Sequence, residues 1–284
     1  MRTRSTFALS TFWLAALTMA SLPLLWSSSA NADSCRKKAP RHHMVHPTSS
    51  SVFVSTRDGV AKIYLGNADG SSARRLTRMS GEERNPCLSP NGRTIVFQSN
   101  RDGNWEIYRI NRDGSNLRRF TRDSGPYAPS DTEPVFSPDG GTIAWTSTRV
   151  NGDYSDIWLM NSTGDNQRRL TSSDDEHSIS CPTFAPKGMQ IAYLERSTQT
   201  SVPLWTLNMH DLHTGATTTT PVIAQIQIGR DKTTASSTYH LRYNPQGTRL
   251  SYVEKAPAPS GVPLWFYDLK SNTPAPGLEP TSST

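Results

Sequence analysis

The stretch that decides the fold is Pro134-Val135-Phe136-Ser137-Pro138-Asp139-Gly140-Gly141-Thr142-Ile143-Ala144-Trp145. Within it, Pro138 presets its own φ and Gly140 accepts a positive φ, so the middle of the stretch is typical of a tight turn. The residues on either side include β-branched and aromatic side chains, which favour short strands. We therefore expect an antiparallel hairpin here.

The same pattern returns along the chain. Its Pro-to-Gly core recurs at 86–92, 134–140 and 182–188, and more weakly at 243–247, so the closing glycines step by 48, 48 and 59 residues. Two further anchors accompany it, an aliphatic-aromatic pair (Ile63-Tyr64, Ile107-Tyr108, Ile157-Trp158, Leu204-Trp205, Leu264-Trp265) and an arginine pair (Arg74-Arg75, Arg118-Arg119, Arg168-Arg169). Self-similarity at this period indicates an array of one structural unit, and five units fit into the chain.

Each unit reads as four short strands. In the third unit these are 134–137, 142–147, 156–161 and 167–171, and Asp-Gly and Asn-Gly pairs between strands along the chain are hairpin-turn chemistry. Four-stranded units arranged around an axis describe a β-propeller, whereas a β-solenoid would need one strand per repeat. The sequence predicts an all-β propeller of about five four-stranded blades, or six if the termini build an extra or shared blade.

The ends of the array are incomplete. The first unit lacks a clear opening strand and the last unit lacks a clear closing strand, so residues 39–48 or 272–284 would have to supply them. We predict a signal peptide at 1–32, a flexible basic leader at 33–50, the propeller at 51–270, and a disordered Pro/Thr/Ser-rich tail at 271–284.

The repeat resembles the WD-like propeller repeat of the TolB family. The residues that carry the resemblance are 134–145, Asp156-Ile157-Trp158-Leu159-Met160-Asn161, Arg169-Leu170-Thr171 and Asn104-Trp105-Glu106-Ile107-Tyr108, within a likeness that spans about 51–269. The resemblance implies a periplasmic propeller of the Tol-Pal envelope system that binds the peptidoglycan-associated lipoprotein. TolB proteins also carry an α/β domain before the propeller, and only residues 33–50 lie between Ala32 and the first repeat here.

The N-terminus reads as a secretory signal. Arg2 and Arg4 precede an apolar stretch at about 7–26, and Ala30-Asn31-Ala32 offers a small-residue cleavage site. We expect cleavage after Ala32, no stable membrane span afterwards, and a periplasmic or secreted protein. An uncleaved anchor and a lipoprotein modified at Cys35 are the alternatives.

Charge and cysteine content argue against nucleic-acid binding and against a cysteine-based metal or redox site. Removing residues 1–32 takes away two arginines and no acid, so the formal net charge falls from +6 to +4, and we expect no nucleic-acid binding. Cys35, Cys87 and Cys181 show no C-x-x-C spacing, and an odd number cannot all pair within one chain. Buried thiols and one loose terminal thiol are the expected state.

Carboxylates recur in the segments that lead from the fourth strand of one unit to the first strand of the next. Such segments meet at one end of a propeller, so the sequence predicts an acidic mouth of the central channel that binds a cation, with Ca²⁺ as the candidate, or a basic segment of a partner. Solvated loop charges offset by arginines are the alternative. The candidate residues are Glu82, Glu83, Asp131, Glu133, Asp174, Asp175, Glu176 and His177.

The other polar repeats are assigned more modest roles. Each arginine pair is expected to protect an outer edge strand from pairing with other chains, rather than to bind a ligand. His42, His43 and His46 fall in the leader, and a metal cluster of His177, His210 and His240 is a hypothesis that no spacing demands.

No motif for nucleophilic catalysis is present, because the chain has no G-x-S-x-G, no H-E-x-x-H and no Gly-rich phosphate loop opening a helix. The repeats also resemble the propellers of dipeptidyl-peptidase-type enzymes, but the chain stops where their catalytic domain would begin. We predict an exported module that binds an envelope protein or lipoprotein, with no catalysis and no cofactor. The alternative is a carbohydrate lyase or hydrolase with a channel metal or carboxylate site.

Overall fold

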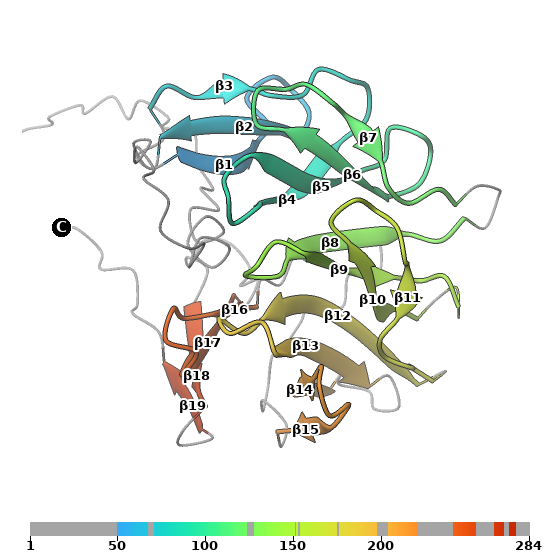
Figure 1. Cartoon of the computed structure of the whole chain (residues 1–284), viewed down its shortest axis with the longest axis vertical. Coiled ribbons are helices and arrows are strands. Elements are labelled where there is room, and N and C mark those ends of the chain that lie inside the picture. The colour runs from blue at the N-terminus through green and yellow to red at the C-terminus, as the bar shows by residue number, and fades with distance from the viewer. Residues whose placement is uncertain are drawn as a thin grey trace, which may run out of the picture.

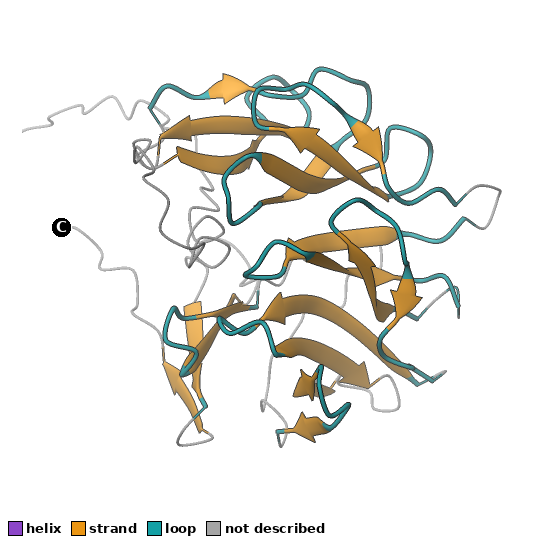
Figure 2. Cartoon of the chain, in the orientation of Figure 1, coloured by secondary structure: helices purple, strands orange, loops and turns teal. Residues whose placement is uncertain are grey.

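The computed structural model describes residues 50–67, 71–123, 128–150, 152, 154–174, 176–197, 204–220, 241–253, 264–269 and 273–276. These residues form antiparallel strands and loops, and Figure 2 shows no helix among them. In the described part of the chain, no helix could therefore cross a membrane.

Within the described ranges, nineteen strands form five sheets that follow one another in chain order (Figure 1). Sheet 1 contains β1 (Ser50–Ser55), β2 (Lys62–Asn67) and β3 (Arg74–Arg75). Sheet 2 contains β4 (Glu83–Leu88), β5 (Thr94–Ser99), β6 (Glu106–Asn111) and β7 (Arg118–Arg119). Sheet 3 contains β8 (Asp131–Phe136), β9 (Thr142–Ser147), β10 (Asp156–Asn161) and β11 (Arg168–Arg169).

Sheet 4 contains β12 (His177–Phe184), β13 (Gln190–Ser197), β14 (Leu204–Asp211) and β15 (Thr217–Thr219). Sheet 5 contains β16 (Arg242–Tyr243), β17 (Arg249–Val253), β18 (Leu264–Asp268) and β19 (Thr273–Pro276). In every sheet each strand pairs with the next along the chain. The prediction of an all-β propeller built from four-stranded units is confirmed.

The ends of the array differ from the middle in the way the repeats predict. Among the described residues, sheet 1 has three strands and lacks the counterpart of β4, β8 and β12. At the other end, β19 pairs with β18 and closes sheet 5. The prediction of a disordered tail is therefore wrong for residues 273–276. Pro274 and Pro276 did not prevent a strand, because an edge strand tolerates a residue that has no amide hydrogen to donate.

The turn predicted between Ser137 and Thr142 forms as expected. Gly140 has φ +76° and donates its amide hydrogen to the carbonyl of Ser137 at 2.9 Å. Strand β9 then pairs with β10 from Thr142↔Asn161 to Ser147↔Asp156. The expected second and third strands of this unit match β9 and β10, whereas the first strand starts three residues earlier, at Asp131.

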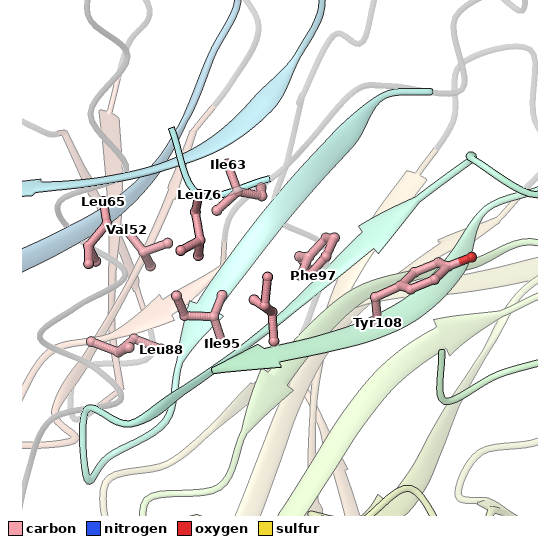
Figure 3. Packing of buried hydrophobic residues seen from close by; sticks show 9 residues of the cluster. Val52, Ile63, Leu65, Leu76, Leu88, Ile95, Phe97 and Tyr108 are labelled. Atoms are coloured by element: carbon pink, nitrogen blue, oxygen red, sulfur yellow. The ribbon is translucent and has the colours of Figure 1, made fainter. Parts of the chain in front are cut away.

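Four hydrophobic layers lie between successive sheets. Between sheets 1 and 2, Val52, Ile63, Ile95, Phe97 and Tyr108 pack together (Figure 3). Corresponding layers lie between sheets 2 and 3, sheets 3 and 4, and sheets 4 and 5. A sheet buries both of its apolar faces only when it packs against a neighbouring sheet on each side, which explains why the unit must repeat.

Candidate functional site at the connector face

One end of the sheets collects the chain segments that join successive sheets. We call this end the connector face. Its described residues are the connecting segments 76–82, 120–123, 128–130, 170–174 and 176, and the turns 56–61, 100–105, 148–150, 152 and 154–155. Main-chain hydrogen bonds join the connectors to the turns: Asn100 donates to the carbonyl of Glu82 at 3.3 Å, and Thr148 donates to that of Ser130 at 3.2 Å. The predicted meeting of the connectors at one end is therefore observed within the described residues.

Not all of the predicted acidic residues belong to connectors. Glu83, Asp131 and His177 are the first residues of β4, β8 and β12, and Glu133 lies within β8. Placing these four in connecting segments was wrong, because the innermost strands extend further toward the connector face than their apolar residues indicate. Asp175 lies outside the described residues.

Two of the acids are fully buried in ion pairs. Glu83 lies 2.7 Å from Nη2 of Arg101 and 3.7 Å from Nζ of Lys62, and it also accepts a hydrogen bond from the hydroxyl of Thr77. Asp131 lies 2.8 Å from Nη2 of Arg149. Both carboxylates have 0% exposure, so they cannot meet a partner at the surface.

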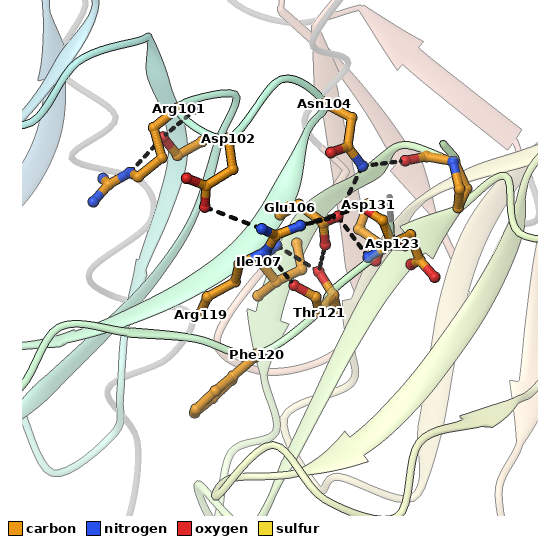
Figure 4. Close-up of polar contacts among 12 residues, drawn as sticks. Arg101, Asp102, Asn104, Glu106, Ile107, Arg119, Phe120, Thr121, Asp123 and Asp131 are labelled. Atoms are coloured by element: carbon orange, nitrogen blue, oxygen red, sulfur yellow. Dashed lines mark hydrogen bonds and ion pairs between the residues drawn. The ribbon is translucent and has the colours of Figure 1, made fainter. Parts of the chain in front are cut away.

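A group of carboxylates with metal-like spacing is also neutralised internally. Oxygen atoms of Glu106, Asp123 and Asp131 lie within 4.8 Å of one another. However, Glu106 pairs with Arg119 at 2.8 Å, and Arg149 pairs with Asp123 at 2.9 Å and with Asp131 at 2.8 Å. Figure 4 shows Arg119 between Asp102 and Glu106. The guanidinium groups supply the positive charge that a metal ion would otherwise bring, so this arrangement fits a structural role.

Glu133 faces a small cavity inside the ring of sheets. The cavity, about 20 Å³, is lined by Asn85, Glu133, Cys181 and Arg242 among others, and it has room for about one water molecule. Oε2 of Glu133 accepts hydrogen bonds from the amide of Cys181 at 2.8 Å and from Oγ1 of Thr146 at 2.9 Å. Burial raises the pKa of the Glu133 carboxyl and the pKa of the Cys181 thiol.

The cavity residues share an unusual backbone conformation. Asn85, Glu133 and Cys181 have φ of +49°, +56° and +58°, and each precedes a proline at the same repeat position. The ladder between the first two strands of sheets 2, 3 and 4 shifts register at these residues, so each is a β-bulge that turns a side chain inward. Cys87 and Cys181 are buried thiols that form no disulfide among the described residues, as expected of structural thiols, and Cys35 lies outside the described residues.

The remaining described acids reach the surface in two groups, one around the half-buried Glu82 and one around the exposed Asp174 and Glu176. Glu82 pairs with Arg84 at 2.8 Å, and the guanidinium of Arg84 lies over the ring of Trp105 with 5.8 Å to the ring centre. Further along, Asp174 is exposed and lies 2.6 Å from Nδ1 of His177, close to the exposed Glu176. The hydrogen bond with Asp174 raises the pKa of His177 above its ordinary value.

The histidine hypothesis is corrected by the register of sheet 4. His177 pairs with Ser197 at the connector face, whereas His210 pairs with Ile191 near the other end of the sheet and contacts Oγ1 of Thr217 at 2.9 Å. These two residues therefore do not share a metal site. The leader residues His42, His43 and His46, and also His240, lie outside the described residues.

Sequence reasoning missed the arginines and the aromatic residue of this face. Trp105 belongs to the repeat motif at 104–108, but its half-buried position beside Arg84 depends on the packing of two loops. Arg57, Arg101 and Arg149 stand at equivalent places, each two residues after the last residue of β1, β5 or β9. Alignment of the repeats on those strand ends would have found them.

Comparison with known proteins places the fold. A family model described as the TolB beta propeller domain matches residues 34–210. Among solved structures, TolB from Acinetobacter baumannii superimposes with a TM-score of 0.62 and 19% identity over 80% of this chain and 50% of that chain. TolB from Agrobacterium tumefaciens gives a TM-score of 0.52 and 21% identity over 60% of each chain.

A structure from outside the TolB proteins is similarly close in shape. A chain of the nidogen/laminin complex gives a TM-score of 0.59 and 17% identity over 84% of this chain and 78% of that chain. No curated protein matches the sequence. At these identities the structures show the fold alone, and this chain spans only 50% and 60% of the two TolB chains.

Proposed function

The chain belongs to the TolB β-propeller domain family, and from this premise we propose that it is an exported, non-catalytic module that binds another protein of the cell envelope through its connector face. The partner is an envelope protein or lipoprotein, as in the Tol-Pal system. Export rests on the signal-like residues 1–32.

The observation that carries the proposal is the surface group formed by Glu82, Arg84 and Trp105. Tryptophan and arginine are the residue types most enriched among energetically dominant interface residues. Here the arginine is held by an ion pair at 2.8 Å and by the indole ring, so it is already ordered before a partner arrives. Trp105 is half-buried, and it is anchored because its carbonyl accepts the amide hydrogen of Asp131.

Charged residues around this group support protein binding rather than catalysis. Glu83, Asp131 and Glu106, which have the chemistry of acid-base catalysts, are buried and engaged with arginine or lysine side chains. The exposed acids Asp174 and Glu176 instead form an accessible rim, which can steer a charged partner.

The test is photo-crosslinking in living cells. A photoreactive amino acid replaces Trp105 in one strain and Lys187 in a matched control strain; Lys187 is exposed in the turn between β12 and β13, at the opposite end of the sheets. We expect an adduct with one envelope protein from position 105 that disappears with Arg84→Ala and is absent from position 187. Equal labelling from both positions, or an adduct insensitive to Arg84→Ala, would contradict the proposal.

A further inference from the structure

Three arginines are held in the same way at the connector face. Arg57, Arg101 and Arg149 each donate a main-chain hydrogen bond to the serine hydroxyl two residues earlier, at 3.3, 3.4 and 3.3 Å. Each guanidinium also lies over an aromatic ring, Tyr64 at 4.7 Å, Tyr108 at 4.4 Å and Trp158 at 5.2 Å. The repeat therefore presents the guanidinium group in one fixed orientation three times.

In sheets 2 and 3 this guanidinium binds a carboxylate. Arg101 reaches Oε1 of Glu83 at 2.7 Å, and Arg149 reaches Oδ2 of Asp131 at 2.8 Å. Both acids are the first residue of an innermost strand, and in the ladder they stand opposite Ser99 and Ser147, the last residues of β5 and β9. Two copies of the motif thus define where a carboxylate is accepted.

In sheet 1 the same guanidinium has no carboxylate partner among the described residues. Arg57 is exposed, and within this part of the chain its hydrogen bonds go to the hydroxyl of Ser55, at 3.3 Å from its main-chain nitrogen and 3.0 Å from Nε. Among the described residues, no carboxylate forms an ion pair with Arg57. The adjacent Asp58 is engaged elsewhere, by Nη1 of Arg75 at 3.2 Å and by the hydroxyl of Tyr64.

Sheet 1 also lacks a second acid that sheets 2 and 3 have. At the first position of β6 and β10 stand Glu106 and Asp156, which pair with Arg119 at 2.8 Å and Arg169 at 2.5 Å. The first residue of β2 is Lys62, which turns to Glu83 of sheet 2.

The connector end of sheet 1 therefore carries an excess of positive charge. There Arg57 and Arg75 face the single carboxylate of Asp58. The positive charge at this end of sheet 1 is complementary to an acidic ligand.

We propose that Arg57 binds a carboxylate side chain of an extended acidic segment of the partner protein. The carboxylate would occupy, beside Ser55, the place that Glu83 occupies beside Ser99 and Asp131 beside Ser147. A guanidinium fork held on an aromatic ring is suited to this, because its planar donors match a carboxylate and little freedom is lost on binding. The inference rests on the proposed function in one respect, that the segment belongs to the protein bound at the connector face.

The test uses the exported chain and two acetylated, amidated pentapeptides. One has a central glutamate flanked by valine and threonine, and the other has glutamine at the same place. Binding is measured by NMR titration of the arginine Nε–H signals at low ionic strength, in the wild type and in Arg57→Gln, Arg57→Lys and Arg118→Gln. Arg118 is the matched control, because it is exposed on outer strand β7 and its guanidinium donates to Oδ1 of Asn116 rather than to a carboxylate within the described part of the chain.

We expect the glutamate peptide to bind about fivefold more tightly than the glutamine peptide, as for a single exposed charge pair. Arg57→Gln should abolish this difference, Arg57→Lys should keep part of it, and Arg118→Gln should leave it unchanged. The Arg57 signal should shift on titration while the signals of Arg101 and Arg149, which already hold carboxylates, stay in place.

A wild type that does not distinguish the peptides overturns the proposal, and so does a preference that survives Arg57→Gln. The titration is repeated with Glu279→Gln. If the glutamate peptide binds only to this variant, Glu279 of the same chain occupies the Arg57 site in the wild type, and the assignment to a partner protein is overturned. These outcomes are independent of crosslinking at position 105, so failure of the Arg57 assignment is distinguishable from failure of the connector face as the binding surface.

Discussion

Neighbouring acids at the connector face have opposite environments. Glu82 lies at the surface beside Arg84, whereas Glu83 has 0% exposure between Lys62 and Arg101. Successive side chains of an extended segment point to opposite sides, so one residue separates a surface charge from a buried one. The energetic consequences differ accordingly, because exposed pairs are screened by water and buried charges are not.

We predict that Glu83→Gln destabilises the protein strongly. Loss of the carboxylate leaves Lys62 and Arg101 buried without a counter-charge, which costs about 3–5 kcal/mol. The matched control Glu82→Gln breaks an exposed pair and should cost less than about 1 kcal/mol. Urea unfolding of the two variants measures the difference, and similar losses of unfolding free energy would show that the buried pair has no special role.

Within each outer strand, the two arginines of the pair have different environments and different roles. Arg118 on β7 is exposed and Arg119 turns inward to Glu106 at 2.8 Å and Asp102 at 3.1 Å, and the pairs on β3 and β11 alternate in the same way. The sequence interpretation treated both members as edge protection. Only the exposed member can serve that purpose, while the other ties its outer strand to buried or half-exposed acids.

We expect the two arginines of β7 to give different phenotypes. Arg118→Thr should change the unfolding free energy by no more than about 0.5 kcal/mol, but it should promote self-association, because a long charged side chain no longer blocks the open edge. Arg119→Thr should instead lower stability by about 3 kcal/mol, since Glu106 remains buried without its counter-charge. Light scattering and chemical unfolding separate the two effects, and identical behaviour of both variants would refute this division.

For the whole molecule, the last sheet depends on the chain's final residues. β19 pairs with β18 from Trp265↔Pro276 to Asp268↔Thr273, at the far end of an array of five sheets. Each sheet is stabilised by its neighbours, so a weakened terminal sheet also exposes the layer between sheets 4 and 5.

Truncation after residue 272 should therefore loosen sheet 5. The amides of β18 that face β19 should exchange faster with solvent, because they lose their partner strand. A chain that ends at Pro276 keeps β19 and serves as the control. Hydrogen exchange followed by mass spectrometry measures this, and equal protection of β18 in both chains would mean that β19 contributes nothing to the sheet.

Local sequence was sufficient to predict the repeating unit. The Pro-Asp-Gly turn before Thr142 and the β-branched and aromatic residues of 142–147 specify a hairpin from nearest neighbours, and the recurrence of this pattern specifies an array. The same reasoning predicted that the connectors meet at one end. These features depend on residues close together in the chain, where turn geometry and strand propensity act directly.

Which charges face water depends on the packing of strands and loops. Glu83, Asp131 and Glu106 are buried, whereas Glu82 and Asp174 are not. The buried acids are paired with side chains 13 to 21 residues away in the chain, such as Arg149 for Asp131 and Lys62 of the neighbouring sheet for Glu83. Likewise, Arg57 matches Arg101 and Arg149 in sequence position, but no carboxylate of the described residues pairs with it as Glu83 and Asp131 pair with them. Burial and ion pairing depend on contacts between residues distant in sequence, so the sequence alone determined the scaffold, and packing between sheets determined where it can bind.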